Sequence, residues 1–165
     1  MKQLIEQIMN CKRCRLWKSA ENAVPGEGPE DAKIMLVGKN PGEEEDRTGK
    51  PFVGRSGKFL DKTLNQNDIQ RKSIFITSVV KHKTPNNRKP RPDEINTCLP
   101  YLIKQIDNIK PEIIVLMGKV AMQTPRRQGI KYLETYHPTA AMRFPKFRDK
   151  FEGDFRLLKK LIEKI

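Results

Sequence analysis

The sequence contains no apolar run of about 18 residues, the length that a membrane-spanning helix needs. It also has only three cysteines and two histidines among its 165 residues. An odd number of cysteines argues against a disulfide framework and favours metal or redox chemistry in a reducing compartment. Residues 1–9 include an acid and have amphipathic spacing, which predicts a helix and not a signal peptide. We therefore expect a cytoplasmic protein.

Acidic residues are few beside the basic ones. Twenty Asp and Glu against 33 Lys and Arg leave a formal net charge of +13. Such a surplus favours a polyanionic partner, nucleic acid or an anionic membrane, although a solvated, lysine-rich surface explains the charge alone equally well. The length fits one domain over residues 1–165, which is large enough to be stable as a monomer.

Short apolar runs alternate with segments of helical spacing. Strands are expected at Ile34–Val37, Ser73–Val80, Glu112–Met117 and Ile130–Tyr136, and helices at Ser56–Asn65, Asp93–Ile109 (with Pro92 at its start), from Lys119, and at Lys150–Ile165. This alternation predicts an α/β fold: a single-domain three-layer αβα sandwich with a central four-stranded parallel sheet. Ligands bind such sheets at the carboxyl ends of the strands, so the loops after the four strands are the candidate site.

The loop after the first strand is the most unusual. Gly38-Lys39-Asn40-Pro41-Gly42 is followed directly by four acids, Glu43 to Asp46. A simple turn needs only a few of these residues. The length and charge of the stretch predict a loop that holds a ligand.

The cysteines have spacing typical of a metal site. Cys11-Lys12-Arg13-Cys14 is a C-x-x-C pair, Cys98 lies in the helix after the second strand, and His82 lies in the loop before that helix. Together they form a possible tetrahedral set for zinc or an iron–sulfur cluster. The alternative is that Cys98 is a small core residue and His82 a solvated side chain.

From Cys11 to the C-terminal helix, the chain resembles the uracil-DNA glycosylase superfamily, most closely its iron–sulfur branch, family 4. The landmarks are the C-x-x-C pair, Gly26-Glu27-Gly28, Gly38-x-x-Pro41-Gly42-Glu43-Glu44-Glu45-Asp46, Thr48-Gly49-Lys50-Pro51-Phe52-Val53-Gly54-Arg55-Ser56-Gly57, Val79-Val80-Lys81, Pro85-Asn86-Asn87-Arg88 and His137-Pro138-Thr139. The resemblance implies a uracil-DNA glycosylase-like fold. It also implies hydrolysis of the bond between a damaged base and its sugar, with the nucleotide flipped out of the duplex.

The resemblance also assigns roles to individual residues. Phe52 corresponds to the aromatic residue that stacks on the flipped base, and His137 to the histidine that hydrogen-bonds the base as negative charge develops. The remaining base-binding positions are Gly38, Lys39, Gly42 and Ser78. The DNA-binding positions are Arg55 and Ser56 at a helix N-terminus, Thr139, and Met142 or Arg143 in a loop, residues 140–144, that wedges into the duplex.

The first departure from family 4 concerns the residue that positions the attacking water molecule. The family pattern is Gly-Glu-Ala/Gly-Pro-Gly, where this chain has Gly38-Lys39-Asn40-Pro41-Gly42. Gly-x-Asn-Pro-Gly resembles the motif of the mismatch-specific and single-strand-selective branches, in which the asparagine positions the attacking water. The resemblance therefore implies that Asn40 orients the water, with Glu45 as a helper.

The second departure concerns the base. Ser78 stands where the family has an asparagine that hydrogen-bonds the edge of uracil. A hydroxyl rotates and serves either as donor or as acceptor, so we expect less strict discrimination. Uracil, thymine opposite guanine, other substituted uracils and hypoxanthine all remain candidate substrates.

The third departure concerns the metal. His82 stands where family 4 has its remaining cluster cysteine. The resemblance implies a [4Fe–4S] cluster of structural role, held by Cys11, Cys14, Cys98 and His82, with zinc as the alternative. A histidine ligand would raise the potential of the cluster.

The sequence thus predicts a monofunctional DNA glycosylase of base-excision repair with altered base specificity. Its expected partner is damaged or mismatched duplex DNA, or single-stranded DNA, and no membrane. The competing prediction is a non-catalytic iron–sulfur DNA-binding protein that recognises modified bases. Lys39 leaves open a minor lyase activity, and Arg126 and Arg127 either contact DNA or are solvated.

Overall fold

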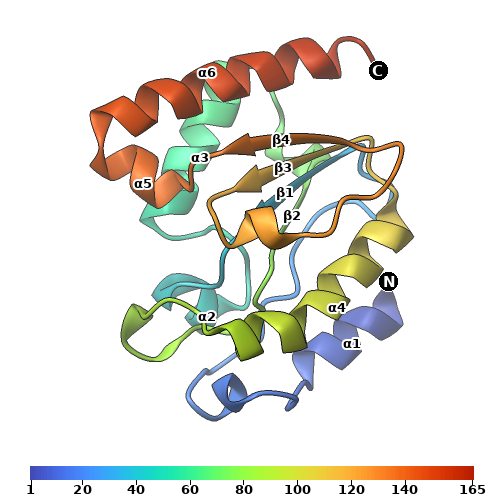
Figure 1. The fold of residues 1–165 in the computed structure, drawn as a ribbon, viewed down its shortest axis with the longest axis vertical. Helices are drawn as coiled ribbons and strands as arrows, with labels where there is room; N and C mark the ends of the chain where they lie inside the picture. Colours follow the sequence, from blue (N-terminus) through green and yellow to red (C-terminus); the bar gives the residue numbers. More distant parts are fainter.

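A four-stranded parallel sheet forms the centre of the protein, whose computed structural model describes residues 1–165. Its strands are β1 (Ile34–Gly38), β2 (Phe75–Ser78), β3 (Ile113–Met117) and β4 (Lys131–Thr135). The spatial order is β2-β1-β3-β4, and every neighbouring pair is parallel (Figure 1). The chain leaves β1 on one side towards β2 and later returns on the other side in β3. The carboxyl ends of β1 and β3 therefore form a topological switch point, where such sheets bind ligands.

Helices cover both faces of this sheet. Helices α1 (Lys2–Met9) and α4 (Pro92–Ile109) lie on one face, and α3 (Arg55–Gln66), α5 (Pro138–Arg143) and α6 (Pro145–Ile162) lie on the other (Figure 1). The short helix α2 (Glu43–Thr48) follows β1 at the carboxyl edge. The predicted three-layer αβα architecture with four parallel strands is confirmed.

Each face of β1 contributes to a separate apolar core. Met35 packs in a cluster with Leu102 and Ile106 of α4, whereas Leu36 packs in another with Phe151 and Phe155 of α6. All five residues of β1 and of β3 are buried. Burial on both faces explains why these strands are uninterrupted apolar runs in the sequence.

Several boundaries differ from the prediction. The second strand, expected at Ser73–Val80, begins at Phe75 because residues 71–73 form a 3-10 turn, and it ends at Ser78. The C-terminal helix begins at Pro145, not Lys150, and the helix expected from Lys119 is one 3-10 turn at Ala121–Gln123. Residues 140–143, expected in a loop, belong to α5. No helix has both the length and the apolar character to cross a membrane.

Candidate active site

A pocket of about 340 Å³ opens at the carboxyl edge of the sheet. Its lining includes nine of the predicted site residues, from four segments of the chain: Lys39, Asn40, Gly42, Glu45, Phe52, Ser56, Ser78, His137 and Thr139. Val24, Pro41, Pro51 and Asn87 complete the lining. The loops after β1, β2 and β4 thus converge as the parallel topology requires.

Asn40, which lines this pocket, has a buried acceptor without a protein partner. Its Nδ2 donates to the carbonyl oxygen of Pro41 at 3.0 Å, which fixes the orientation of the amide. Its Oδ1 is buried and accepts no hydrogen bond from the protein. A buried acceptor without a partner is costly, and in a pocket it is suited to a donor brought by the ligand or by water.

Phe52 is held in a strained conformation beside Gly38. Its φ of 48° is in the left-handed region, which is unfavourable for an aromatic residue. Arg71 donates to the carbonyl oxygens of Phe52 and Pro51. A Cβ on Gly38 would lie 2.6 Å from the Phe52 ring, so the glycine is what allows the ring to reach the pocket.

Glu45 holds the same loop from the other side. Its Oε1 accepts from the backbone N–H of Gly42 at 3.0 Å, and its Oε2 accepts from Val53 and Gly54 at 2.8 and 2.7 Å. Both oxygens of this buried carboxylate are therefore engaged with the backbone. The four acids also have a simple structural explanation, because they form the first turn of α2, where the helix dipole favours negative charge.

His137 is positioned as a neutral donor. It caps α5, and its Nδ1 accepts from the backbone N–H of Thr139 at 3.1 Å, so the ring proton of the neutral form lies on Nε2. Burial, together with the positive charge of Lys39, lowers the pKa of His137 to about 4. The ring lies 5.7 Å from that of Phe52 between centroids.

We expect the pH profile of the reaction to show this lowered pKa. His137 is neutral at every pH well above 4, and its protonation on Nδ1 below that pH would break the bond from Thr139. The value of kcat/KM should thus stay level as the pH falls through 6.5 and decline only towards pH 4. An inflection near 6.5 that disappears in His137→Gln would show that the imidazole titrates normally and contradict this assignment.

Ser78 lies at the floor of the pocket, above a buried lysine that the sequence analysis did not single out. The Nζ of Lys81 donates to the carbonyl oxygen of Ser78, to Thr77 Oγ1 at 2.7 Å and to Gln105 Oε1 at 2.8 Å. Burial lowers the pKa of Lys81 to about 8, so its three donors still match three acceptors at neutral pH. The backbone N–H of Lys81 also donates to Cys98 Sγ at 3.3 Å, which connects the pocket floor to the cysteine region.

Asn87 is a pocket residue that the sequence analysis quoted within a motif but assigned no role. Asn86 and Asn87 both have positive φ, 54° and 56°, and form a tight turn that reaches the pocket. The turn is anchored by Arg88, which makes two bonds of 2.8 Å to the carboxylate of Glu94. The sequence signal for this turn was the pair of adjacent asparagines, because asparagine tolerates the left-handed backbone conformation.

Glu94 is the centre of an ion-pair network. It is fully buried, and Arg15 contacts it at 2.9 Å in addition to Arg88. The hydrogen bonds from Arg88 are the main cause that lowers the pKa of Glu94 to about 2. The network joins the segment after Cys14 to the turn that carries Asn87.

Replacement of Glu94 by glutamine should therefore lower the free energy of unfolding by about 3 kcal/mol at pH 7. Because the carboxyl pKa is depressed in the folded state, its stabilisation is present above pH 4.5 and is lost as the pH falls towards 2. The exposed neighbour Asp93, which pairs with Arg15 on the surface, provides the control Asp93→Asn, whose effect on stability should be much smaller because solvent screens the pair. Urea denaturation across this pH range measures both effects. An equal loss of stability in the two variants would contradict the conclusion that the buried Glu94 is the centre of the network.

The three cysteines lie in one region, and Cys98 belongs to α4 itself. Cys98 packs in a small core with Leu4, Ile8 and Tyr101, and Cys11 packs against that core. Burial raises the pKa of Cys14, and that of Cys98 to about 11, and the neighbouring thiols contribute to each shift. His82 is buried, which lowers its pKa. No group of three or more His, Cys, Asp or Glu side chains is arranged so that it could hold a metal ion.

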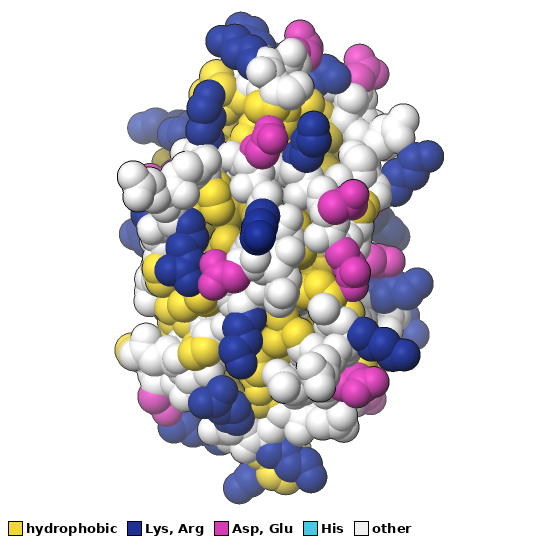
Figure 2. Space-filling view, turned by 90° about the vertical axis from the view of Figure 1, so that its right-hand side faces the viewer, with side chains coloured by type: hydrophobic (Ala, Val, Ile, Leu, Met, Phe, Trp, Pro, Cys, Tyr) yellow, Lys and Arg dark blue, Asp and Glu magenta, His cyan; other side chains and the backbone are white.

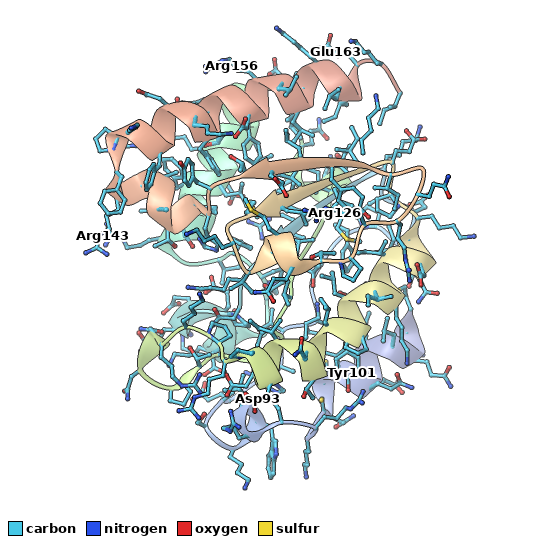
Figure 3. All side chains as sticks on the ribbon, in the orientation of Figure 1. Asp93, Tyr101, Arg126, Arg143, Arg156 and Glu163 are labelled. Carbon is cyan, nitrogen blue, oxygen red and sulfur yellow. The ribbon has the colours of Figure 1, made fainter.

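The predicted DNA-binding residues lie around the mouth of the pocket or beyond it. Arg55 and Ser56 begin α3, and Thr139 and Met142 lie in α5. Arg143 projects outwards from the end of α5, at the edge where the strands end (Figure 3). Arg126 pairs with Glu134, and Arg127 pairs with Asp107 at 2.9 Å, so both have acidic partners within the chain.

A buried amide acceptor, a neutral imidazole donor and an aromatic ring meet at the switch point of a parallel sheet, which is typical of an α/β enzyme. A family model described as the uracil DNA glycosylase superfamily matches residues 25–159. The chain therefore belongs to the uracil DNA glycosylase superfamily. The predictions of this superfamily and of a DNA glycosylase are confirmed.

Individual relatives agree with the family 4 prediction. A type-4 uracil-DNA glycosylase from Saccharolobus solfataricus is 41% identical over 96% of this chain and 85% of that protein. One from Sulfurisphaera tokodaii is 40% identical over 98% of this chain and 84% of that protein. Another, from Thermotoga maritima, is 38% identical over 87% of this chain and 83% of that protein.

Proposed function

We propose that the protein removes uracil from DNA and accepts a wider range of bases than uracil alone. The observation that carries this proposal is the convergence, in one pocket, of the free Oδ1 of Asn40 and the neutral ring of His137. The type-4 uracil-DNA glycosylase relatives support uracil as the first substrate. The wider range follows from Ser78, whose hydroxyl imposes no fixed hydrogen-bond pattern.

In this proposal the flipped base lies against Phe52, and its oxygen accepts from Nε2–H of His137. As the bond between the base and C1′ breaks, its electron pair passes to the base, and the hydrogen bond from His137 stabilises the resulting anion. Asn40 Oδ1 accepts a hydrogen bond from a water molecule, whose oxygen forms the new bond to C1′. The water loses its proton to solvent or to the departing base.

Lys39 and Glu45 have supporting roles in this mechanism. Lys39 lines the pocket, and its positive charge helps to lower the pKa of His137. The same charge disfavours protonation of His137 and favours the negative charge that develops on the departing base. Glu45, predicted as a catalytic helper, is proposed instead as a positioning residue, because backbone N–H groups occupy both of its oxygens. Hydrolysis by water, without lyase chemistry at Lys39, is the proposed reaction.

The test is base release from labelled oligonucleotides that each contain one uracil, thymine, 5-hydroxymethyluracil, hypoxanthine or xanthine. Each is supplied single-stranded and opposite every normal base. We expect release of uracil and of at least one further base. Silence across the panel, with the DNA still tightly bound, would support the alternative of a non-catalytic DNA-binding protein.

Although the side chains are not arranged as a metal site, the three thiols lie close enough to affect one another's pKa and are the donors that a [4Fe–4S] cluster requires. We propose Cys11, Cys14, Cys98 and His82 as its ligands, with zinc as the alternative. When bound, such a cluster supplies a structural link between the N-terminal segment, the loop after β2 and α4. The protein is proposed to act as a monomer.

Protein purified without oxygen should therefore contain iron and acid-labile sulfide and show the visible absorption of a cluster. Cys98→Ser should lose the iron and lower Tm, whereas Lys12→Ala, between the two cysteines, should change neither. His82→Cys should retain the iron with a lower reduction potential, because cysteinate replaces imidazole. Zinc in place of iron, or a metal-free protein as stable as the purified one, would contradict the cluster.

A further inference from the structure

A second cavity opens beside the base pocket. It has a volume of about 860 Å³ and lies among the loop after β3, the end of β4, α5 and the start of α6. Lys39, His137 and Thr139 line both cavities, so the second lies next to the first. A strand whose flipped nucleotide occupies the base pocket must pass close to this groove.

One wall of the groove is a cluster of aromatic rings. Tyr136 and Phe147 are stacked with their centroids 4.1 Å apart, and Phe144 meets Phe147 edge-on at 5.3 Å. Phe144 is 47% exposed, and it is the only aromatic residue among the four large hydrophobic side chains that are exposed. A ring exposed to this extent has the right size and shape to stack on one nucleobase.

The rest of the groove is positively charged. Five cationic side chains line it, of which one, Lys150, pairs with Asp154, and its single acid, Glu134, pairs with Arg126. The cations are Lys39, Lys89, Lys119, Arg143 and Lys150. Arg143 lies over the Phe144 ring at 5.7 Å, which puts a cation at the aromatic wall. By contrast, the face at the opposite edge of the sheet shows acids and bases interspersed (Figure 2).

We propose that this groove binds single-stranded DNA, with one unpaired base next to the flipped nucleotide stacked on Phe144. The inference rests on the proposed function for its choice of DNA as ligand. Aromatic rings with lysines along a groove fit a strand whose bases are free, since a paired base in a duplex offers no face for stacking. The groove therefore favours single-stranded over double-stranded DNA.

The test is binding of one undamaged oligonucleotide sequence, single-stranded or as a duplex, measured by fluorescence anisotropy at fixed salt concentration. Phe144→Ala should weaken single-strand binding by about 5- to 150-fold, the range of one stacked base, and duplex binding by less than about twofold. Phe144→Trp should restore it. Leu157→Ala removes a side chain of similar exposure from α6, away from the groove, and should change neither affinity.

The position of the base is tested with 2-aminopurine placed on either side of a non-cleavable uracil analogue. Its fluorescence should be quenched on one side only, and Phe144→Ala should abolish that quenching. Equal losses of single-strand and duplex affinity, or no loss, would overturn the inference and leave the groove to another ligand or a second copy of the chain. Because undamaged DNA is bound without base release, failure of the proposed function would appear in the base-release panel and not here.

Discussion

Asn40→Ala is expected to reduce the rate of base release by about 10²- to 10³-fold, the effect of losing one preorganised polar group in a catalytic site. The amide is held by its own bond to Pro41, and its Oδ1 has no other partner, so truncation removes the proposed water acceptor without breaking a structural network. Single-turnover kinetics on a uracil-containing oligonucleotide measure the effect. Affinity for the same DNA should change little.

Two further variants separate water positioning from a general loss of structure. Asn40→Asp keeps an acceptor oxygen at the same position and should recover part of the activity. Asn65→Ala removes an exposed asparagine from α3 and should leave the rate unchanged. If Asn40→Ala released uracil as fast as the wild type, the water would have to be held elsewhere in the pocket.

Ser78→Asn is expected to increase the preference for uracil over hypoxanthine and thymine by at least about 100-fold. The substitution puts fixed donor and acceptor groups at the pocket floor, and bases that leave them unpaired are then rejected. Initial rates on the oligonucleotide panel give the ratio of kcat/KM values. Ser78→Ala is the control, because it removes the hydroxyl without adding a fixed pattern and should leave the preference low.

The size of the added side chain needs its own measurement. Ser78 is 5% exposed and its carbonyl accepts from Lys81, so an asparagine here risks overpacking at a cost of about 1–3 kcal/mol. A normal Tm with an unchanged preference would mean that Ser78 does not face the base. In that case Asn87, which also lines the pocket, would be the next candidate for discrimination.

The periodic spacing of apolar residues predicted most of the strands and helices but not the shortest helices. Strands β1 and β3 are fully buried, so their apolar runs were clear, and the spacing of α4 was equally clear over 18 residues. Helices α2 and α5 have six residues each, too few for a repeating pattern. The four acids of α2 were predicted as a charged loop. Their place in the first turn of a helix depends on the turn at Gly42 that precedes them.

The sequence predicted those site residues that belong to short, recognisable motifs. Asn40, Ser78 and His137 each follow or end a strand, so parallel topology alone brings them to one edge of the sheet, whereas Phe52 follows α2 and was placed only by its motif. Contacts between distant segments could not be predicted. The bonds of Glu45 to the Phe52 loop and the inward direction of Lys81 depend on how the loops pack after folding.

The most direct test of the account is single-turnover incubation of the wild-type protein with an end-labelled, uracil-containing single strand, with and without borohydride. We predict free uracil, an unbroken strand with one abasic site, and no protein–DNA adduct trapped by borohydride. A trapped adduct that disappears in Lys39→Ala would contradict hydrolysis by water. Bound DNA from which no base is released would contradict catalysis altogether.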